Sequence, residues 1–453
     1  MSTFCPLPWN SINVRNNGNC RVCCNANSYT KNKGILRNNN GVPHNAGTSN
    51  FDEIRNADLL KEIRSTMLKG EWHAECQRCS NEEASGLSSR REYENNNYPE
   101  VEALAKANTN LDGSIDTNIV PLQYMDIRYG NFCNLKCRMC GATDSHMWIP
   151  DLHKMGIKKY NESDRQVNII IKEDGKATID YDYNWFGKDE KFNLQVMSNI
   201  DNIKKFYIVG GEPLFIEEHY NFLEMVVDSG YANQIYLEYN TNMMNVPDTV
   251  IELWKQFKGV LLGCSIDGYG TVIELQRAPA RWSTLYKNLK KVNKFVSEGE
   301  PIRYDFNLPS VKYSSAAWIA FTITNINVFH LPEFIKWKIE ESGLDHFGVS
   351  SKPIITHHMC HSPNHYNIKC LPKEMKGEVD RRYREFIEYS MTNYSEDTHK
   401  HVHKILTSVT NFMNSEDTHD KYWKAFIEHT KSLDNIRDQS IVEAVPEYEI
   451  YLR

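Results

Sequence analysis

The stretch Asn131-Phe-Cys-Asn-Leu-Lys-Cys-Arg-Met-Cys-Gly141 decides how this chain is interpreted. It places Cys133, Cys137 and Cys140 on one short segment, with three residues in the first gap and two in the second. The next cysteine along the chain is Cys264, so no fourth thiol is close in sequence. A closed structural metal or cluster site uses four protein ligands, whereas three leave one position open. The stretch therefore predicts a metal or cluster site that can accept a small molecule.

The chain around this stretch alternates predicted strands and helices, which is typical of parallel βα units. Strands are predicted at residues 122–129, 205–209, 234–239, 259–264, 318–324 and 346–350. The cysteine stretch directly follows the first of them. Since the chemistry of βα barrels sits at the carboxyl ends of the strands, the cysteines are expected at the barrel mouth.

Three further motifs follow predicted strands. They are Gly210-Gly-Glu-Pro213, Asn240-Thr-Asn242 and Ser265-Ile-Asp-Gly268, and Arg277 lies twelve places after Ser265. Glycines let a backbone approach a ligand closely, and a carboxylate can accept from an ammonium group. Taken singly, each motif has a plainer explanation as a turn, a capped strand end or a surface cation.

Together these motifs resemble the signatures of the radical S-adenosylmethionine (SAM) superfamily. The resemblance implies that Cys133, Cys137 and Cys140 bind a [4Fe-4S] cluster whose open iron binds SAM. It also implies that Gly210, Gly211, Glu212, Asn240, Ser265 and Arg277 bind SAM. Met139 and Met243 depart from the family pattern, which usually has an aromatic residue and a glycine there. A loop of reduced thiols, or part of a zinc site, is the alternative interpretation.

The N-terminal segment has its own cysteines: Cys5, Cys20, Cys23, Cys24, Cys76 and Cys79. Residues 12–14 and 21–23 read as a hairpin across Asn16-Asn-Gly18. The cysteine spacing resembles the "twitch" module, a short relative of the SPASM domain, and its N-terminal place resembles the twitch domain-containing radical SAM proteins. The resemblance implies an auxiliary [4Fe-4S] cluster on Cys5, Cys23, Cys76 and Cys79, with Cys24 as the alternative to Cys23.

A zinc ribbon is the competing interpretation of this segment, with Cys20-x-x-Cys23 paired to Cys76-x-x-Cys79. The two halves are 52 residues apart, much more than the ~15–20 of a compact ribbon. Iron–sulfur ligation is therefore favoured.

Composition narrows the class of protein. Of 453 residues, 40% are hydrophobic and 25% charged, and the net charge is −7, so nothing indicates a nucleic-acid partner. The N-terminal residues lack the features of a signal peptide, and no apolar run reaches the ~18 residues of a membrane span. A cytoplasmic protein is expected, in which twelve cysteines serve metal ligation before disulfides.

The predicted fold is α/β: a partial (β/α)6 barrel of the radical SAM type, a small N-terminal cysteine-rich α+β module and a helical C-terminal extension. The expected boundaries are 1–100 for the auxiliary module, 101–120 for a linker, 121–350 for the barrel with an insertion at 150–190, and 351–453 for the extension.

The leading hypothesis is a radical SAM enzyme that abstracts hydrogen from a substrate. The family resemblance implies a one-electron donor such as flavodoxin or ferredoxin and a peptide or small-molecule substrate. Dehydrogenation or epimerisation of a sugar or small metabolite is the second reading. A non-enzymatic binding protein stabilised by zinc or an iron–sulfur cluster is the third.

Overall fold

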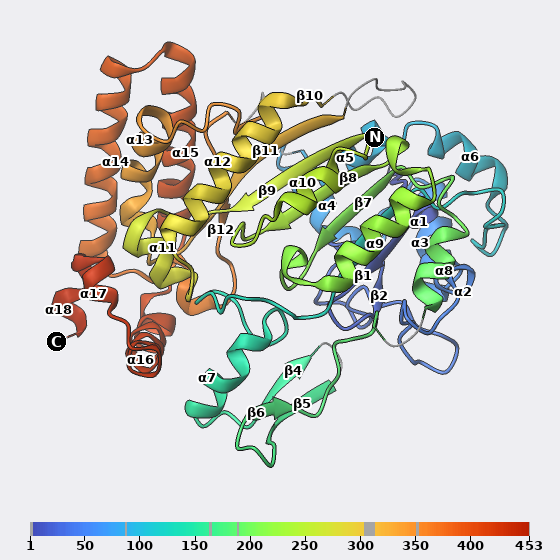
Figure 1. The fold of residues 1–453 in the computed structure, drawn as a ribbon, viewed down its shortest axis with the longest axis horizontal. Coiled ribbons are helices and arrows are strands. Elements are labelled where there is room, and N and C mark those ends of the chain that lie inside the picture. The colour runs from blue at the N-terminus through green and yellow to red at the C-terminus, as the bar shows by residue number, and fades with distance from the viewer. Residues whose placement is uncertain are drawn as a thin grey trace.

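The structure, a computed structural model, describes residues 3–86, 88–162, 165–187, 190–302, 313–349 and 353–452. It is a mixed α/β protein built on a nine-stranded sheet (Figure 1). The strands are β1 Ser11–Val14, β2 Cys20–Arg21, β3 Tyr124–Arg128, β7 Lys205–Val209, β8 Tyr236–Thr241, β9 Gly259–Ser265, β10 Glu300–Pro301, β11 Ser314–Ile323 and β12 Thr356–Met359. Their order is β10-β11-β9-β8-β7-β3-β1-β2, and β12 also pairs with β11. Every pairing is parallel except that of β1 with β2. Among the described residues no ladder joins β2 to the far edge, so the sheet is open.

Five of the six strands predicted for the barrel are confirmed, as β3, β7, β8, β9 and β11, and the sixth is wrong. Residues 346–350 were expected to be a strand, but Phe347 makes only an isolated bridge to Ala317. Gly348 adopts φ +143°, which breaks the extended run, and Ser350 lies outside the described residues. The sixth parallel strand is instead β12, which pairs with Ala320–Ile323 of β11.

The N-terminal hairpin is confirmed and has an additional role. Gly18 turns the chain at φ +82°, as the Asn-Asn-Gly run predicts, and β1 and β2 pair antiparallel. Strand β1 then lies parallel to β3, with Ser11 opposite Tyr124. The N-terminal segment therefore shares one sheet with the barrel strands.

The stretch predicted as a linker, residues 101–120, is folded. It contains helix α6 (Val101–Asn108), in which Val101 and Ala105 are buried. Just after it, Thr109 accepts a hydrogen bond from the indole of Trp9 at 2.8 Å. Its many Asn and Asp residues were misleading because they bond locally within turns rather than marking an extended chain.

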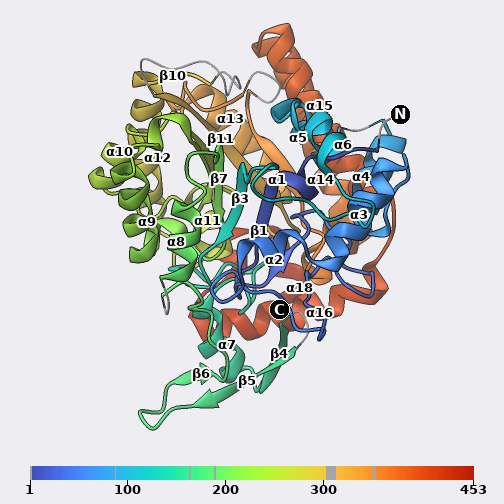
Figure 2. The same cartoon turned by 90° about the vertical axis from the view of Figure 1, so that its right-hand side faces the viewer.

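Helices cover both sides of the sheet (Figure 2). On one side lie α8 (Lys191–Met197), α9 (Glu217–Asp228), α10 (Asp248–Trp254) and α12 (Trp282–Glu298), and α11 (Gly270–Gln276) and α13 (Leu331–Glu340) continue the βα pattern. Phe222 of α9 packs on Phe206 of β7 with ring centroids 5.0 Å apart. The N-terminal helices lie on the other side: α1 (Leu7–Asn10), α2 (Phe51–Arg55), α3 (Asp58–Leu68), α4 (Gln77–Ala84) and α5 (Arg90–Asn97).

The insertion after the cysteine stretch contains α7 (Ile149–Lys154) and the strands β4 (Lys159–Glu162), β5 (Arg165–Ile171) and β6 (Ala177–Ile179). Strands β5 and β6 form the hairpin predicted around Asp174-Gly175, and Gly175 has φ +79°. This small sheet projects from the body of the protein (Figure 1).

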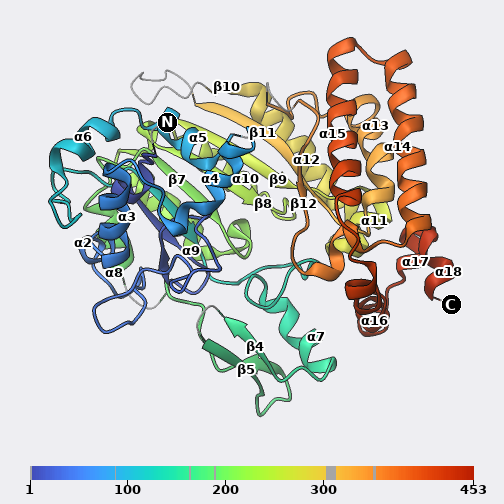
Figure 3. The ribbon, with the colours of Figure 1, turned by 180° about the vertical axis from the view of Figure 1, so that it is seen from behind.

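The C-terminal extension is helical, as predicted. It comprises α14 (Lys373–Asn393), α15 (Glu396–Asn414), α16 (His419–Arg437), α17 (Ile441–Ala444) and α18 (Glu449–Leu452). Helices α14 and α15 stand side by side at one end of the molecule, and α16 runs below them (Figure 3). Within the described ranges, no helix has both the length and the apolar character needed to cross a membrane.

Candidate functional site

The cysteine loop lies at the carboxyl end of β3. Cys133 and Cys137 are buried, and Cys140 is partly exposed. The loop backbone is held against the segment after α11, because Lys136 N–H donates to the Ala278 carbonyl at 2.7 Å. A second bond runs from Arg138 N–H to the Gln276 carbonyl at 2.8 Å. The three thiols are thus fixed by backbone bonds to a neighbouring βα unit.

Several N–H groups point at the sulfur atoms of the loop. Leu135 N–H lies 3.4 Å from Cys133 Sγ, and Asn242 Nδ2 lies 3.9 Å from it. Arg277 Nη1 lies 3.8 Å from Cys137 Sγ. Such donors stabilise thiolate sulfur, and hydrogen bonds to the sulfurs tune the potential of iron–sulfur clusters.

The surroundings of the loop shift the pKa values of its thiols in different directions. Burial, followed by the nearby Cys137, raises the pKa of Cys133 to about 12. The pKa of Cys137 is lowered, first by its hydrogen bond with the Cys140 thiol and then by the Arg277 guanidinium, although burial opposes them. A bound cation would favour the thiolate forms of these cysteines.

Glu212 occupies a buried turn beside the loop. It is 1% exposed, and its Oε1 accepts from the Thr241 hydroxyl at 2.7 Å and from Leu214 N–H at 3.1 Å. Its Oε2 accepts from Asn242 N–H at 2.6 Å. A carboxylate offers about four acceptor sites, so one remains for a further donor. Burial raises the pKa of Glu212 to about 6.

The two glycines before Glu212 occupy positions where a side chain would clash with neighbouring residues. Gly211 has φ +53°, and a Cβ there would lie 2.2 Å from the Phe132 carbonyl oxygen. That same carbonyl accepts from Glu212 N–H at 2.8 Å. Gly210 has φ +81° and packs against Arg128. Gly211 is therefore required by the close approach of the cysteine loop, whereas Gly210 is required by its positive φ and by the close approach of Arg128 and Asn16.

The remaining predicted SAM residues are dispersed around this centre. Asn240 is exposed and donates through Nδ2 to the Tyr207 hydroxyl at 2.6 Å. Arg277 is tied through Nε to Asp267 Oδ2 at 2.6 Å, which leaves Nη1 for Cys137. Ser265 ends β9 beside Ala320 of β11.

Sequence reasoning missed Asn242, which lies closer to the cysteines than Asn240 does. Its side chain donates to Asn134 Oδ1 at 2.8 Å and reaches Cys133, while its backbone holds Glu212. The Asn-Thr-Asn run gave no signal to choose between the two asparagines. The turn after β8, in which Met243 adopts φ +60°, brings Asn242 to the cysteines.

A second group of thiols gathers in the N-terminal segment. Cys5, Cys23, Cys76 and Cys79 line one cavity together with Arg90 and Arg91. Burial and then the three other thiols raise the pKa of Cys5. Cys24 does not line this cavity, and the groups that influence its pKa after burial include Arg90 and Asp126 instead. The structure thus brings together the four thiols of the predicted set.

Helix α16 seals the back of the cysteine loop. Arg138 is buried and forms an ion pair with Asp434. Arg437 binds Asp151 at 2.8 Å, and its guanidinium lies 4.5 Å from the ring centroid of Trp148. The Trp148 indole in turn donates to the Cys137 carbonyl at 3.0 Å.

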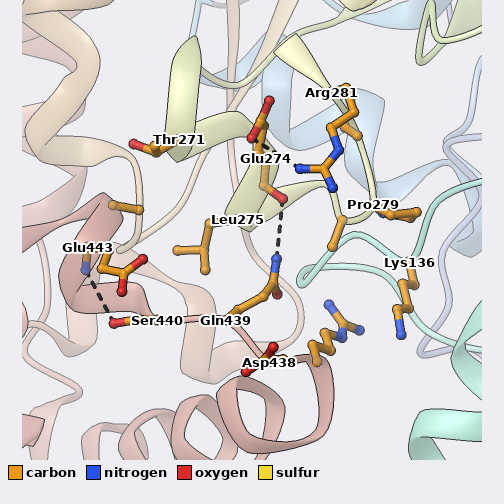
Figure 4. A pocket seen from close by; sticks show the side chains of 14 residues that line it. Lys136, Thr271, Glu274, Leu275, Pro279, Arg281, Asp438, Gln439, Ser440 and Glu443 are labelled. Atoms are coloured by element: carbon orange, nitrogen blue, oxygen red, sulfur yellow. Dashed lines mark hydrogen bonds and ion pairs between the residues drawn. The ribbon is translucent and has the colours of Figure 1, made fainter.

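A cavity of about 450 Å³ opens between this seal and the segment after α11. Figure 4 shows Glu274 and Arg281 on one wall and Gln439 opposite, where Gln439 Nε2 donates to the Glu274 carbonyl at 3.5 Å. Lys136 of the cysteine loop also lines it. Acidic and basic side chains are mixed in this lining.

Among the described residues, no group of three or more His, Cys, Asp or Glu side chains is close enough to hold a single metal ion. The ligands of a single metal ion all bond to the same atom, at about 2.0–2.3 Å. The thiolates of a [4Fe-4S] cluster bind different irons.

Comparison with known proteins gives little more. No protein-family model matches the chain, and no curated protein matches its sequence. Two crystal structures of Streptococcus suis SuiB, bound to S-adenosylmethionine and to precursor peptide SuiA, align with 73% of this chain at 15% identity, with TM-scores of 0.31 and 0.32. The alignments span 63% and 64% of those chains, less than two thirds. A third SuiB structure covers 85% of this chain and 69% of its own at a TM-score of 0.30. Likeness at this level carries no argument about activity.

Gly211→Ala should displace the cysteine loop. The added Cβ meets the Phe132 carbonyl, and φ +53° is itself unfavourable for alanine. We expect the free energy of unfolding to fall by about 2–4 kcal/mol in denaturant titration. Gly377→Ala is the control: its Cβ meets nothing within 4 Å on α14, so stability should be unchanged or rise by up to ~1 kcal/mol. Equal effects of both substitutions would contradict this role of Gly211.

Proposed function

We propose that this chain is a radical SAM enzyme in which Cys133, Cys137 and Cys140 hold a [4Fe-4S] cluster with one open iron. The observation that carries the proposal is the convergence on the loop sulfurs of N–H donors from two other segments: Asn242, just after β8, at Cys133, and Arg277, just after α11, at Cys137. A donor set of this kind fits thiolates that ligate a metal cluster. When reduced by one electron, such a cluster supplies the cleavage of SAM to methionine and a 5′-deoxyadenosyl radical, which takes a hydrogen atom from the substrate.

The residues around the loop have distinct proposed roles toward SAM. Glu212 has one acceptor site left, which can receive the ammonium group of SAM. Arg277 is held by Asp267 through Nε and donates to Cys137 through Nη1. Its proposed contact with the SAM carboxylate uses the remaining N–H groups of the guanidinium. Gly210, Gly211, Asn240 and Ser265 remain proposed SAM contacts, and we add Asn242.

The four thiols in the N-terminal cavity are proposed to hold an auxiliary cluster. With four cysteine ligands every iron is bound by protein, so the cluster would transfer electrons rather than bind SAM. Arg90 and Arg91 line the same cavity and would offset the negative charge of a thiolate-ligated cluster.

The substrate class is proposed from the family resemblance. Proteins with twitch and SPASM modules mostly modify ribosomal peptides, so a peptide is the first candidate and a sugar or small metabolite the second. The electron donor is proposed to be a flavodoxin or ferredoxin.

Cys137→Ala should abolish reductive SAM cleavage, because it removes one of only three cluster thiolates. The measurement is 5′-deoxyadenosine formed by anaerobically reconstituted protein after chemical reduction. Cys264→Ala is the control, because Cys264 is a buried thiol for which we propose no cluster role. Undiminished deoxyadenosine from the Cys137 variant would refute the assignment.

Glu212→Gln should weaken SAM binding by about tenfold or more while iron content stays near wild type, since a charge-assisted bond is worth roughly 1.5–3 kcal/mol. Burial raises the Glu212 pKa to about 6, so its carboxylate becomes protonated as the pH falls from 7 to 5. Wild-type affinity should weaken over that range, and the variant should lack this dependence. Glu217→Gln, at an exposed position on α9, is the control. Equal SAM affinity of wild type and variant at pH 7 would count against the role.

Cys76→Ala and Cys23→Ala should each remove about four irons per chain, whereas Cys24→Ala should leave the iron content unchanged. Substrate-free SAM cleavage should survive in all three, because the Cys133 loop is intact. The iron, sulfide and zinc contents of each variant are measured, and they distinguish an iron–sulfur cluster from a zinc site. A zinc-containing, iron-free N-terminal site would favour the structural zinc alternative for this segment.

A further inference from the structure

Two buried arginines lie directly behind the cysteine loop. Arg138 stands between Cys137 and Cys140 in the chain, and its side chain is 0% exposed. Arg437, the last residue of α16, has a side chain that is 1% exposed. Its guanidinium lies 4.5 Å from the ring centroid of Trp148, whose indole donates to the Cys137 carbonyl at 3.0 Å. Both positive charges are therefore held out of water and close to the loop.

Neither guanidinium has its full set of hydrogen bonds. Arg138 donates through Nη2 to Asp434 and to Gln439 Oε1 at 3.3 Å, whereas its Nε and Nη1 have no hydrogen-bond partner among the described residues. Arg437 donates through Nε to Asp151 at 2.8 Å, and its Nη1 and Nη2 likewise have none within the described ranges. Buried donors without acceptors cost free energy, so these two cations need a physical explanation.

The charges behind the loop do not cancel. Lys136 and Arg437 share a single carboxylate, Asp151, at 2.9 and 2.8 Å. Arg138 is paired with Asp434. Three cations therefore meet two carboxylates on this side of the loop, which leaves an excess of one positive charge.

The charges on the other sides of the loop are accounted for. Arg277 is neutralised by Asp267 at 2.6 Å. Asp144, which follows the loop, is exposed and accepts from Asn16 at 2.9 Å. Glu212 remains, and the proposed function assigns it to the ammonium group of SAM.

The open cavity beside the seal adds no buried charge. Glu274 lies 3.8 Å from Arg281, and Asp438 and Glu443 are exposed, so water and salt screen them. Burial lowers the pKa of His429, which also lies near the two arginines, to about 4. That histidine is therefore neutral at pH 7, and the excess of one positive charge at the rear of the loop stands.

We propose that Arg138 and Arg437 raise the reduction potential of the cluster proposed on Cys133, Cys137 and Cys140, by placing buried positive charge behind it. The inference rests on the proposed function, because it concerns that cluster. Net charge, hydrogen bonding and solvent exposure set the potentials of iron–sulfur clusters. A charge also acts much more strongly in a dry environment than in water. Reduction adds one electron to the cluster, and a cation that water does not screen favours that added negative charge.

The test measures the midpoint potential of full-length, anaerobically reconstituted protein by redox titration followed by electron paramagnetic resonance. The signal chosen is the one that changes when SAM is added, since only a cluster with an open iron responds to it, and the titrations are run without SAM. Arg138→Gln and Arg437→Gln should each lower the potential. At the wild-type midpoint the ratio of reduced to oxidised cluster should fall by about tenfold, which is ~59 mV for a one-electron couple.

Asp434→Asn separates charge from structure, because it breaks the same ion pair from the other side. It removes a negative charge, so the ratio should rise by about tenfold. Arg138→Lys should keep a ratio close to that of the wild type, because lysine retains the charge and lacks only the guanidinium fork. Shifts of Arg138→Gln and Asp434→Asn in the same direction would mean that the pair only holds α16 in place, and would overturn the inference.

Lys400→Gln is the matched control. It removes one positive charge from α15, where the side chain is 63% exposed, and should leave the potential unchanged. If Arg138→Gln fails to bind iron, Arg437→Gln and Asp434→Asn decide the question through the same opposite shifts. Unmoved potentials in the charge variants overturn this inference alone, whereas a wild type without any SAM-responsive signal overturns the proposed function and this inference with it.

Discussion

One backbone hydrogen bond organises the candidate site: Glu212 N–H donates to the Phe132 carbonyl at 2.8 Å. It joins the cysteine loop after β3 to the turn after β7, and the two backbones can approach only because residue 211 is a glycine. Glu212 then holds the next turn through Asn242 N–H. The ends of three adjacent strands are thereby set in one register. These bonds fix the relative positions of the cysteine sulfurs, the buried carboxylate and the asparagine amide.

The local motifs could be predicted from the sequence, and their long-range partners could not. The strand before Cys133 could be predicted from its apolar and aromatic residues. The Gly-Gly-Glu turn could be predicted from its two glycines and its carboxylate. The placement of β1 beside β3 joins residues more than a hundred positions apart, and no local pattern encodes that pairing. Strand β12 was missed because Thr-His-His-Met has neither apolar alternation nor β-branched enrichment. Its strand character comes from pairing with β11.

The same limit applies to the candidate site. The resemblance to the twitch module indicated Cys5, Cys23, Cys76 and Cys79, with Cys24 as the alternative to Cys23. Only the fold brings the four thiols of that set to one cavity and places Cys24 near other groups.

The ion pair between Arg138 and Asp434 has a consequence for how the protein is made on the ribosome. Arg138 lies inside the cysteine loop, and its partner follows 296 residues later. While translation covers that interval, β3, β7 and β8 can already pair, but the rear of the loop is open to the surroundings. The order of synthesis therefore leaves a period in which the three thiols can be reached from the rear of the loop. That access ends when α16 emerges and docks.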